Sequence, residues 1–370
     1  MNLKTSIDMA QATRLTREGR LHEALALLQG RGRPLPVPPA ETTAPDRAPK
    51  PSPPASLLDK LRSMPLVRAR KAGVAADAPA PHAGARFESR RHQGHGDSRG
   101  YRLYVPSTYG DEPLPLVVML HGCTQSPEDF ATGTGMNELA EEQSFLVAYP
   151  AQSSSANGNR CWNWFNAQDQ QRDRGEPALI AGITREVMRE FAVDPARVYV
   201  AGLSAGAAAA VIVARAYPEL FAAAGVHSGL ACGAASDVAS AFAAMRQGGS
   251  ANPGYTAAPV PTIVFHGDQD RTVSPVNARQ VLSQARGGAQ LASSSRRGHA
   301  SGGRDYTITV EVDAEGTPIL EHWLLHGVGH AWSGGSDAGS YTDPQGPDAS
   351  REMMRFFSHH VAGARPADRR

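Results

Sequence analysis

Residues 198–210, which read VYVAGLSAGAAAA, constrain the fold of this chain more than any other segment. They begin with β-branched and apolar residues, which is typical of a buried parallel strand, and end in an alanine-rich helical pattern. The turn between matches G-x-S-x-G, in which a serine occupies a strained elbow between strand and helix. Gly202 and Gly206 predict close packing of the helix against the strand. Ser204 is therefore a candidate nucleophile, and the alternative is a glycine-rich turn with a surface serine.

Length and charge bound the remaining possibilities. The chain has 370 residues, with Lys+Arg 37 against Asp+Glu 36 and a formal net charge of +1. This balance gives no reason to expect a nucleic-acid partner. No run approaches the roughly 20 apolar residues of a transmembrane helix. Charged residues interrupt each apolar run near the start, so we expect no signal peptide and a cytoplasmic location, with export by a non-standard route as the alternative.

Changes in composition divide the chain into four predicted parts. Residues 1–32 have helical spacing of apolar residues and predict a hairpin leader that docks to a partner or dimerises, with a weakly ordered leader as the alternative. Residues 33–85 are proline-rich and then basic, which predicts a largely disordered linker. Residues 86–362 form the predicted folded domain, and residues 363–370 a disordered tail.

Within residues 86–362, strand and helix patterns alternate. The first two strands predict an antiparallel hairpin at a sheet edge. The later strands alternate with helices, which predicts a mostly parallel central sheet with helices on both faces. The expected strands are 87–91, 101–105, 116–120, 145–149, 198–203, 223–227, 262–266 and 320–325, and the expected helices are 135–143, 178–191, 205–217 and 350–359.

The carboxyl ends of parallel strands are where the chemistry of such a sheet is expected. Ser204 follows one strand, Asp270 follows the strand at 262–266, and His330 follows the strand at 320–325. The order Ser, Asp, His along the chain is that of the α/β-hydrolase fold. We therefore predict this fold and a catalytic triad of these three residues.

The acid and the base each have a competitor in the sequence. Asp268 also follows the strand at 262–266, but we favour Asp270 because it lies beyond the first tight turn, where Asp268 is expected to cap backbone N–H groups. His330 lies beyond two glycines that let its loop fold over the serine. His326 is expected to pack at the strand end.

Two backbone amides are candidates for the oxyanion hole. Ala205 begins the helix after the nucleophile, so its N–H is free to face an oxyanion. The second donor of this fold comes from a loop after an early strand, where we favour Cys123, with Thr124 as the alternative. His121, at the start of this loop, is expected to be structural.

Five motifs together resemble the esterase family of polyhydroxybutyrate depolymerases, whose relatives include feruloyl and acetylxylan esterases. These are HGCTQ, CWNWF, GLSAG, HGDQDRTV and GVGHAWSGG, within a resemblance that spans about residues 86–362. It implies an α/β hydrolase that cleaves esters through Ser204, Asp270 and His330 without a metal or cofactor. Secreted depolymerases of polymer granules carry a signal peptide and a substrate-binding domain, and we expect neither here.

The resemblance also implies where substrate binds. It puts Trp162, Asn163 and Trp164 in a loop that borders the substrate, with Trp332 close by. Because Trp162 and Trp164 alternate across a loop, we expect at least one tryptophan to line an apolar cleft, although core packing is the commonest use of tryptophan.

Cysteine usage leaves one question open. There are three cysteines in the chain, and the resemblance assigns Cys123 and Cys161 to loops at the rim of the site, where they could pair and leave Cys232 free. A cytoplasmic location would instead keep the thiols reduced.

These features predict a serine carboxylic-ester hydrolase that acts on poly- or oligo-3-hydroxybutyrate-type esters through an acyl-enzyme. One alternative is a feruloyl or acetylxylan type of carbohydrate esterase. An alternative of another class is a non-catalytic scaffold or granule-surface protein on the same fold. In either case the leader is a candidate for docking to a granule or another surface.

Overall fold

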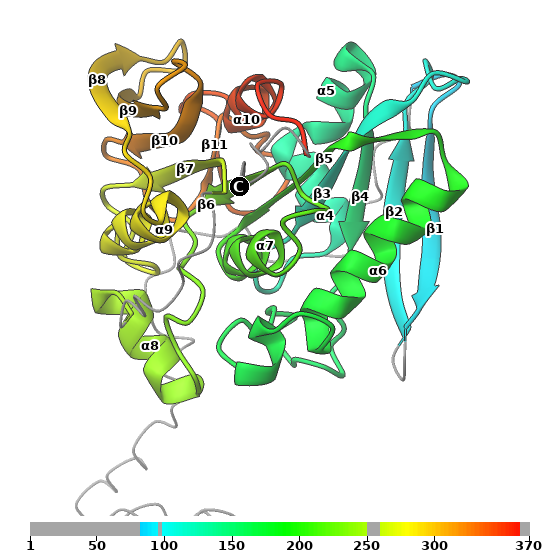
Figure 1. Ribbon diagram of the computed structural model, residues 1–370, viewed down its shortest axis with the longest axis horizontal. Coiled ribbons are helices and arrows are strands. Elements are labelled where there is room, and N and C mark those ends of the chain that lie inside the picture. The colour runs from blue at the N-terminus through cyan, green and yellow to red at the C-terminus, as the bar shows by residue number, and fades with distance from the viewer. Residues whose placement is uncertain (1–81, 95–97, 250–259, 363–370) are drawn as a thin grey trace, which may run out of the picture. The chain divides into compact units, whose positions relative to one another are not determined.

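Ten strands form one mixed sheet in the order β1-β2-β4-β3-β5-β6-β7-β10-β9-β8 (Figure 1). The structure is a computed structural model that describes residues 82–94, 98–249 and 260–362. The predicted leader and tail and nearly all of the predicted linker lie outside the described residues, so that division of the chain stays a prediction. Among the described helices, none combines the length and the apolar character that crossing a membrane requires.

The middle of the sheet is parallel and both edges are antiparallel. β4, β3, β5, β6, β7 and β10 run parallel, whereas β1 and β2 extend one edge and β9 and β8 the other. The strands are β1 (Arg86–Gln93), β2 (Ser98–Val105), β3 (Leu114–Leu120), β4 (Leu146–Pro150), β5 (Val193–Leu203), β6 (Ala223–His227), β7 (Thr262–Gly267), β8 (Ala292–His299), β9 (Asp305–Val312) and β10 (Pro318–Leu325). A separate short parallel pair joins β11 (Trp332–Ser333) and β12 (Thr342–Asp343).

Helices cover both faces of the sheet because its central strands are apolar on both sides. In β3, Val118 belongs to one hydrophobic cluster, and its neighbours Val117 and Met119 belong to the other. The first cluster includes side chains of α6 (Gly175–Glu190), α7 (Ala205–Ala216), α8 (Val238–Gln247) and α9 (Val276–Arg286). The second includes side chains of α4 (Pro127–Thr134), α5 (Met136–Gln143) and α10 (Ala349–Phe357). A 3-10 turn, η1 (Ala167–Gln170), precedes α6.

The α/β-hydrolase architecture predicted from the sequence is confirmed, and so is the antiparallel edge hairpin of β1 and β2. Each expected strand and helix is present with ends shifted by a few residues. The prediction omitted the helices α4, α8 and α9, the strands β8 and β9, and the short elements η1, β11 and β12. The sheet therefore continues beyond β10, the strand expected to be its last.

Candidate active site

Ser204 occupies a sharp turn between β5 and α7. Its backbone has φ 57° and ψ −118°, a conformation that side-chain-bearing residues rarely adopt. Two hydrogen bonds hold the turn: the Ser204 amide donates to the carbonyl oxygen of His227 at 2.9 Å, and its own carbonyl accepts from Ala208 at 3.0 Å. The serine is thereby presented at the carboxyl ends of the parallel strands.

The two glycines of the turn leave room for backbone contacts. A Cβ atom on Gly202 would lie 2.5 Å from the carbonyl carbon of Gly206 and 2.7 Å from the carbonyl oxygen of Leu120. A Cβ atom on Gly206 would lie 2.6 Å from the carbonyl oxygen of His121. Side chains at these positions would separate α7 from the end of β3, so the structure has the close packing that the glycines predict.

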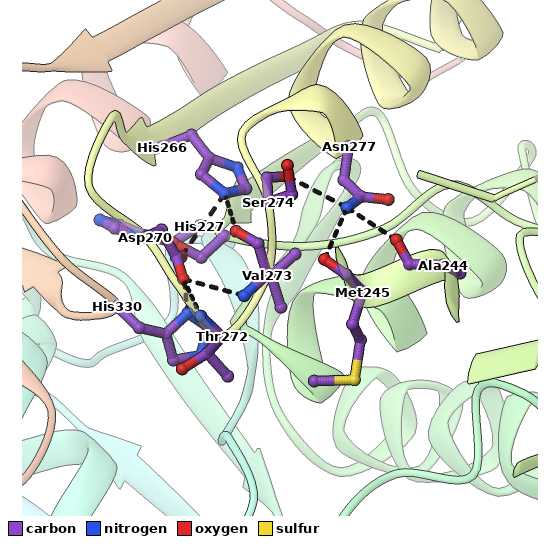
Figure 2. A network of polar contacts seen from close by, with 11 residues as sticks. His227, Ala244, Met245, His266, Asp270, Thr272, Val273, Ser274, Asn277 and His330 are labelled. Atoms are coloured by element: carbon purple, nitrogen blue, oxygen red, sulfur yellow. Dashed lines mark hydrogen bonds and ion pairs between the residues drawn. The ribbon is translucent and has the colours of Figure 1, made fainter. Parts of the chain in front are cut away.

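Asp270 and His330 form a hydrogen-bonded pair at the same edge of the sheet. The Nδ1 atom of His330 donates to Oδ2 of Asp270 at 2.7 Å (Figure 2). The other carboxylate oxygen of Asp270 accepts from the amides of Thr272 and Val273, each at 2.9 Å. Three donors therefore fix the orientation of the buried Asp270 carboxylate.

A second imidazole, that of His266, approaches the same carboxylate from the opposite side (Figure 2). Its Nε2 atom donates to the carbonyl oxygen of Val273 at 2.8 Å and lies 3.5 Å from Oδ2 of Asp270. Burial raises the pKa of the Asp270 carboxyl, but the contacts with His266 and His330 lower it more, and the pKa ends well below its usual range. Asp270 is thus ionised near neutral pH.

Asp268 and His326, the alternatives to Asp270 and His330 in the sequence, pair with each other. His326 donates from Nδ1 to Oδ2 of Asp268 at 3.1 Å, and its Nε2 accepts from the Thr307 hydroxyl at 2.9 Å. The other oxygen of Asp268 accepts from the amide of Gly327 at 2.8 Å. Asp268 thus accepts from a backbone N–H group, but from the loop after β10 and not from its own turn, where the sequence predicted the capping. This pair joins the loop after β7 to the loop after β10.

Two further histidines near the turn are buried and neutral. His121 donates from Nδ1 to the carbonyl of Gly122 at 2.8 Å and accepts at Nε2 from the amide of Gln152 at 3.0 Å. Burial lowers the pKa of His121 to about 4. His227 accepts at Nε2 from the amide of Ser333 at 3.1 Å, and burial lowers its pKa to about 3. Both rings support loops, which agrees with the structural role expected for His121.

The loop after β3, residues 121–125, is called the oxyanion loop here. It has one backbone amide that is a candidate donor to an oxyanion. The Thr124 amide donates to the carbonyl oxygen of Asn159 at 2.7 Å, so this alternative donor is already engaged. Within the part of the chain that the structure describes, no group accepts from the amide of Cys123, and Ala205 is the first residue of α7, where an N–H has no partner inside the helix. Cys123 and Ala205 remain the candidate oxyanion donors.

Cys123 and Cys161 form a disulfide, and Cys232 is buried as a free thiol. The bridge closes a loop of sequence separation 38 and ties the oxyanion loop to the segment that follows β4. The side chain of a candidate oxyanion residue is therefore covalently anchored.

Reduction of this bridge is expected to lower both stability and turnover. For the separation of 38 residues, the loss of loop constraint corresponds to about 4 kcal/mol of unfolding free energy. Urea unfolding with and without reductant measures the change, and Cys161→Ser is the control because reductant should leave that variant unaffected. Equal unfolding midpoints of the parent in both conditions would contradict the prediction.

The three tryptophans expected near the substrate are core residues in this structure. Trp162 and Trp332 are each 1% exposed, and their Nε1 atoms donate to the carbonyl of His121 at 3.0 Å and to the Ser350 hydroxyl at 3.2 Å. Trp164 is 5% exposed and belongs to the same core as Trp162. All three rings are packed into the hydrophobic core, so the structure does not show the apolar cleft that at least one of them was predicted to line.

Asn163 is likewise engaged by protein groups, in helix α6 and in its own loop. Its amide and its Nδ2 atom donate to Glu176, at 2.7 and 2.8 Å, and its Oδ1 atom accepts from Asn157 at 3.0 Å. These bonds occupy the polar groups expected to contact substrate. Asn163 therefore stabilises the conformation of the loop that contains it, by bonding to Glu176 and Asn157.

Glu176, the buried acceptor of these bonds, is expected to make stability depend on pH. Burial raises the pKa of its carboxyl from 4.5 to about 7, although hydrogen bonds from Asn163 and Gln152 oppose this. Because the folded-state pKa is raised, this contribution to stability is complete below pH 4.5 and is lost as the pH rises through about 7. The loss is roughly 3 kcal/mol.

Unfolding free energies measured between pH 4.5 and 8 test this. Glu176→Gln should flatten the slope relative to the parent, whatever its absolute stability. Glu142→Gln, a change at an exposed carboxylate on α5, is the control and should keep the slope. An unchanged slope in Glu176→Gln would show that other groups cause it.

Among the described residues, no group of three or more His, Cys, Asp or Glu side chains is arranged to hold a metal ion. The loops at the carboxyl ends of the parallel strands carry a serine with a strained backbone and a histidine bonded to a buried carboxylate. This arrangement can support nucleophilic attack on a carbonyl.

The fold and this site define an α/β hydrolase with a serine nucleophile elbow. A family model described as "Esterase PHB depolymerase" matches residues 99–303. The chain belongs to this family.

Individual relatives agree with this assignment. The chain is 35% identical over 228 residues to poly(3-hydroxyalkanoate) depolymerase C of Paucimonas lemoignei, covering 58% of this chain and 54% of the relative. It is 30% identical over 200 residues to a probable acetylxylan esterase A of Neosartorya fischeri, covering 49% of this chain and 53% of the relative. The chain thus spans about half the length of these relatives.

A solved structure supports the fold. The acetyl xylan esterase from Aspergillus awamori has a TM-score of 0.58 and 24% identity, over 74% of this chain and 99% of that one. The match extends over nearly the whole of that structure, so the two chains share the α/β-hydrolase fold.

Proposed function

We propose that this chain is a serine esterase of the polyhydroxybutyrate depolymerase or acetylxylan esterase type. The observation that carries the proposal is the 2.7 Å hydrogen bond between His330 and the buried Asp270, at the sheet edge where Ser204 occupies its strained turn. Family membership supports the same reading. The proposed triad is Ser204, His330 and Asp270, with the amides of Cys123 and Ala205 as the oxyanion hole.

In the proposed mechanism, His330 accepts the proton of Ser204 through Nε2 while the serine oxygen attacks the ester carbonyl. Asp270 holds Nδ1–H of His330 and stabilises the imidazolium that forms. The two amides donate to the oxyanion of the tetrahedral intermediate. His330 then protonates the departing alcohol, which leaves an acyl-enzyme on Ser204.

The second half of the reaction repeats these steps with water. His330 removes a proton from water as its oxygen attacks the acyl carbon. Collapse of the second intermediate releases the acid and returns the proton to Ser204. Each turnover consumes one water and needs no other reactant.

For the substrate, we propose oligomers or polymers of 3-hydroxybutyrate-type esters, on the strength of the relative named as a poly(3-hydroxyalkanoate) depolymerase. The second candidate is an acetylated or feruloylated carbohydrate, supported by the relative named as an acetylxylan esterase. A non-catalytic scaffold is less well supported, since a scaffold has no need of an ionised Asp270 bonded to His330. Docking of the leader to a granule remains a proposal about residues outside those described.

We also propose that the chain works in an oxidising, extracellular location, which is the alternative to the cytoplasm. The disulfide of Cys123 and Cys161 supports this, because such bridges persist mainly in oxidising compartments. Thiol alkylation of the protein recovered from separate cell fractions tests the location.

A panel of esters tests the activity and the substrate class together. The purified chain and Ser204→Ala are compared on p-nitrophenyl acyl esters, a 3-hydroxybutyrate oligomer, methyl ferulate and acetylated xylan. Hydrolysis of the oligomer by the parent alone supports the depolymerase proposal. Hydrolysis confined to xylan or ferulate esters moves the assignment to a carbohydrate esterase. Absence of all hydrolysis would overturn the esterase proposal.

A further inference from the structure

A buried glutamine braces the loop that carries the Cys123 amide. Gln125 is 2% exposed, and its Oε1 atom accepts from the amide of Gly122 at 2.9 Å. Its Nε2 atom lies 3.0 Å from Oδ2 of Asp129 and 3.1 Å from the carbonyl oxygen of Ser340. We propose that Gln125 is a positioning residue, which aims the Cys123 N–H at the oxyanion. This inference rests on the proposed ester hydrolysis.

The two hydrogen-bond partners of the Gln125 side chain, the Gly122 amide and the Asp129 carboxylate, explain why a glutamine is required. The amide of Gly122 can only donate, so it must meet an oxygen, and the carboxylate of Asp129 can only accept, so it must meet an N–H group. Glutamine supplies one of each at a fixed spacing. A glutamate at this position would bring a second negative charge next to Asp129, and the two would repel each other. A methionine would leave the Gly122 amide and the Asp129 carboxylate without this hydrogen bond in a buried site.

The outer anchor of Gln125 is firmly held. Asp129 lies in the first turn of α4, where its amide donates to the hydroxyl of Ser126 at 3.2 Å. Its Oδ1 atom accepts from the amide of Ser340 at 2.9 Å, and its Oδ2 atom also accepts from the Ser340 hydroxyl. Gln125 therefore connects the oxyanion loop to a capped helix and to the segment around Ser340.

Within the oxyanion loop, the groups next to the Cys123 amide already have bonding partners. Once Gln125 holds Gly122, the peptide that contains the Cys123 N–H has little freedom to rotate. The other restraints are the bond from the Thr124 amide to Asn159 at 2.7 Å, the bond from His121 to the carbonyl of Gly122 at 2.8 Å, and the disulfide to Cys161. Loss of the Gln125 contact would free this peptide at its Gly122 end.

Steady-state kinetics of Gln125→Glu and Gln125→Met test the inference. We expect kcat to fall roughly 10²-fold, because the donor is misplaced. KM should change by less than about threefold, since substrate binding before the reaction does not need this donor. Phenylboronic acid, which forms a tetrahedral adduct with a catalytic serine, should lose affinity in parallel with kcat/KM.

Asn137→Ala is the matched control. Asn137 on α5 accepts from the Tyr149 hydroxyl at 2.7 Å in a buried site, so its loss should lower the melting temperature and leave kcat and boronate affinity unchanged. If the Gln125 variants lose only melting temperature, as this control does, the inference is overturned. If the parent protein has no esterase activity, both the proposed function and the inference are overturned. If the parent is active and the Gln125 variants have the same kcat as the parent, only the inference is overturned.

Discussion

Ser204→Ala is expected to lower kcat by about 10⁶-fold, because the serine and histidine of a triad act as one unit. We also expect the serine at this position to lower the free energy of unfolding, although activity requires it. The φ of 57° and ψ of −118° at Ser204 are strained for any residue with a Cβ atom, and glycine adopts them freely. Ser204→Gly should therefore be inactive but more stable, by about 1 kcal/mol after its greater unfolded-state entropy is subtracted.

Ester hydrolysis and thermal unfolding of the two variants measure these effects. Ser204→Ala keeps the strain, so it is the control for the stability gain of Ser204→Gly. Both variants should lack activity equally. A melting temperature of Ser204→Gly at or below that of Ser204→Ala would contradict the strain argument, and residual turnover near the parent level in either variant would exclude Ser204 as nucleophile.

Asp270→Asn is expected to lower kcat by about 10⁴-fold, the size of effect that the same change has in a serine protease triad. The amides of Thr272 and Val273 need an acceptor, so the asparagine oxygen is expected to face them and its NH₂ group to face His330. His330 would then turn its Nδ1 lone pair to that NH₂ group and carry its proton on Nε2. In that tautomer it cannot accept the proton of Ser204.

Asp268→Asn is the matched control for this prediction. It makes the same change two residues earlier in the same loop, in the carboxylate that pairs with His326. We expect a loss of less than about tenfold, since only the shape of the loop is affected. Measured kcat values for the two variants decide the assignment of the acid, and a larger loss in Asp268→Asn would reverse it.

The central sheet could be predicted because its strands are strongly patterned. β3, β5, β6 and β7 are apolar on both faces, and turn residues bound them, so period and length alone identify them. β8 reads ASSSRRGH and is exposed at nearly every position, so no hydrophobic period marks it. It forms a strand because β9 pairs with it, and β9 in turn pairs with β10. Pairing of this kind is a tertiary effect that the local sequence does not encode.

The triad could be predicted because chain order and strand ends restrict where such residues lie. The roles of His266 and Gln125 could not, since they depend on which way a side chain points inside the fold. The tryptophans at 162 and 164 show the same limit. A loop has no repeating period that separates inside from outside, and the spacing Trp-Asn-Trp therefore could not reveal that both rings are buried.

The glycines that flank the nucleophile limit how this active site can diversify. Since a single carbon atom at Gly202 or Gly206 would collide with main-chain atoms, neither position can be varied to reshape the surroundings of Ser204. Leu203 and Ala205, the neighbours of Ser204, are also enclosed, at 1% and 3% exposed. A mutant library aimed at new substrates should therefore leave this pentapeptide untouched and place its diversity in loops that approach Ser204 from other strands.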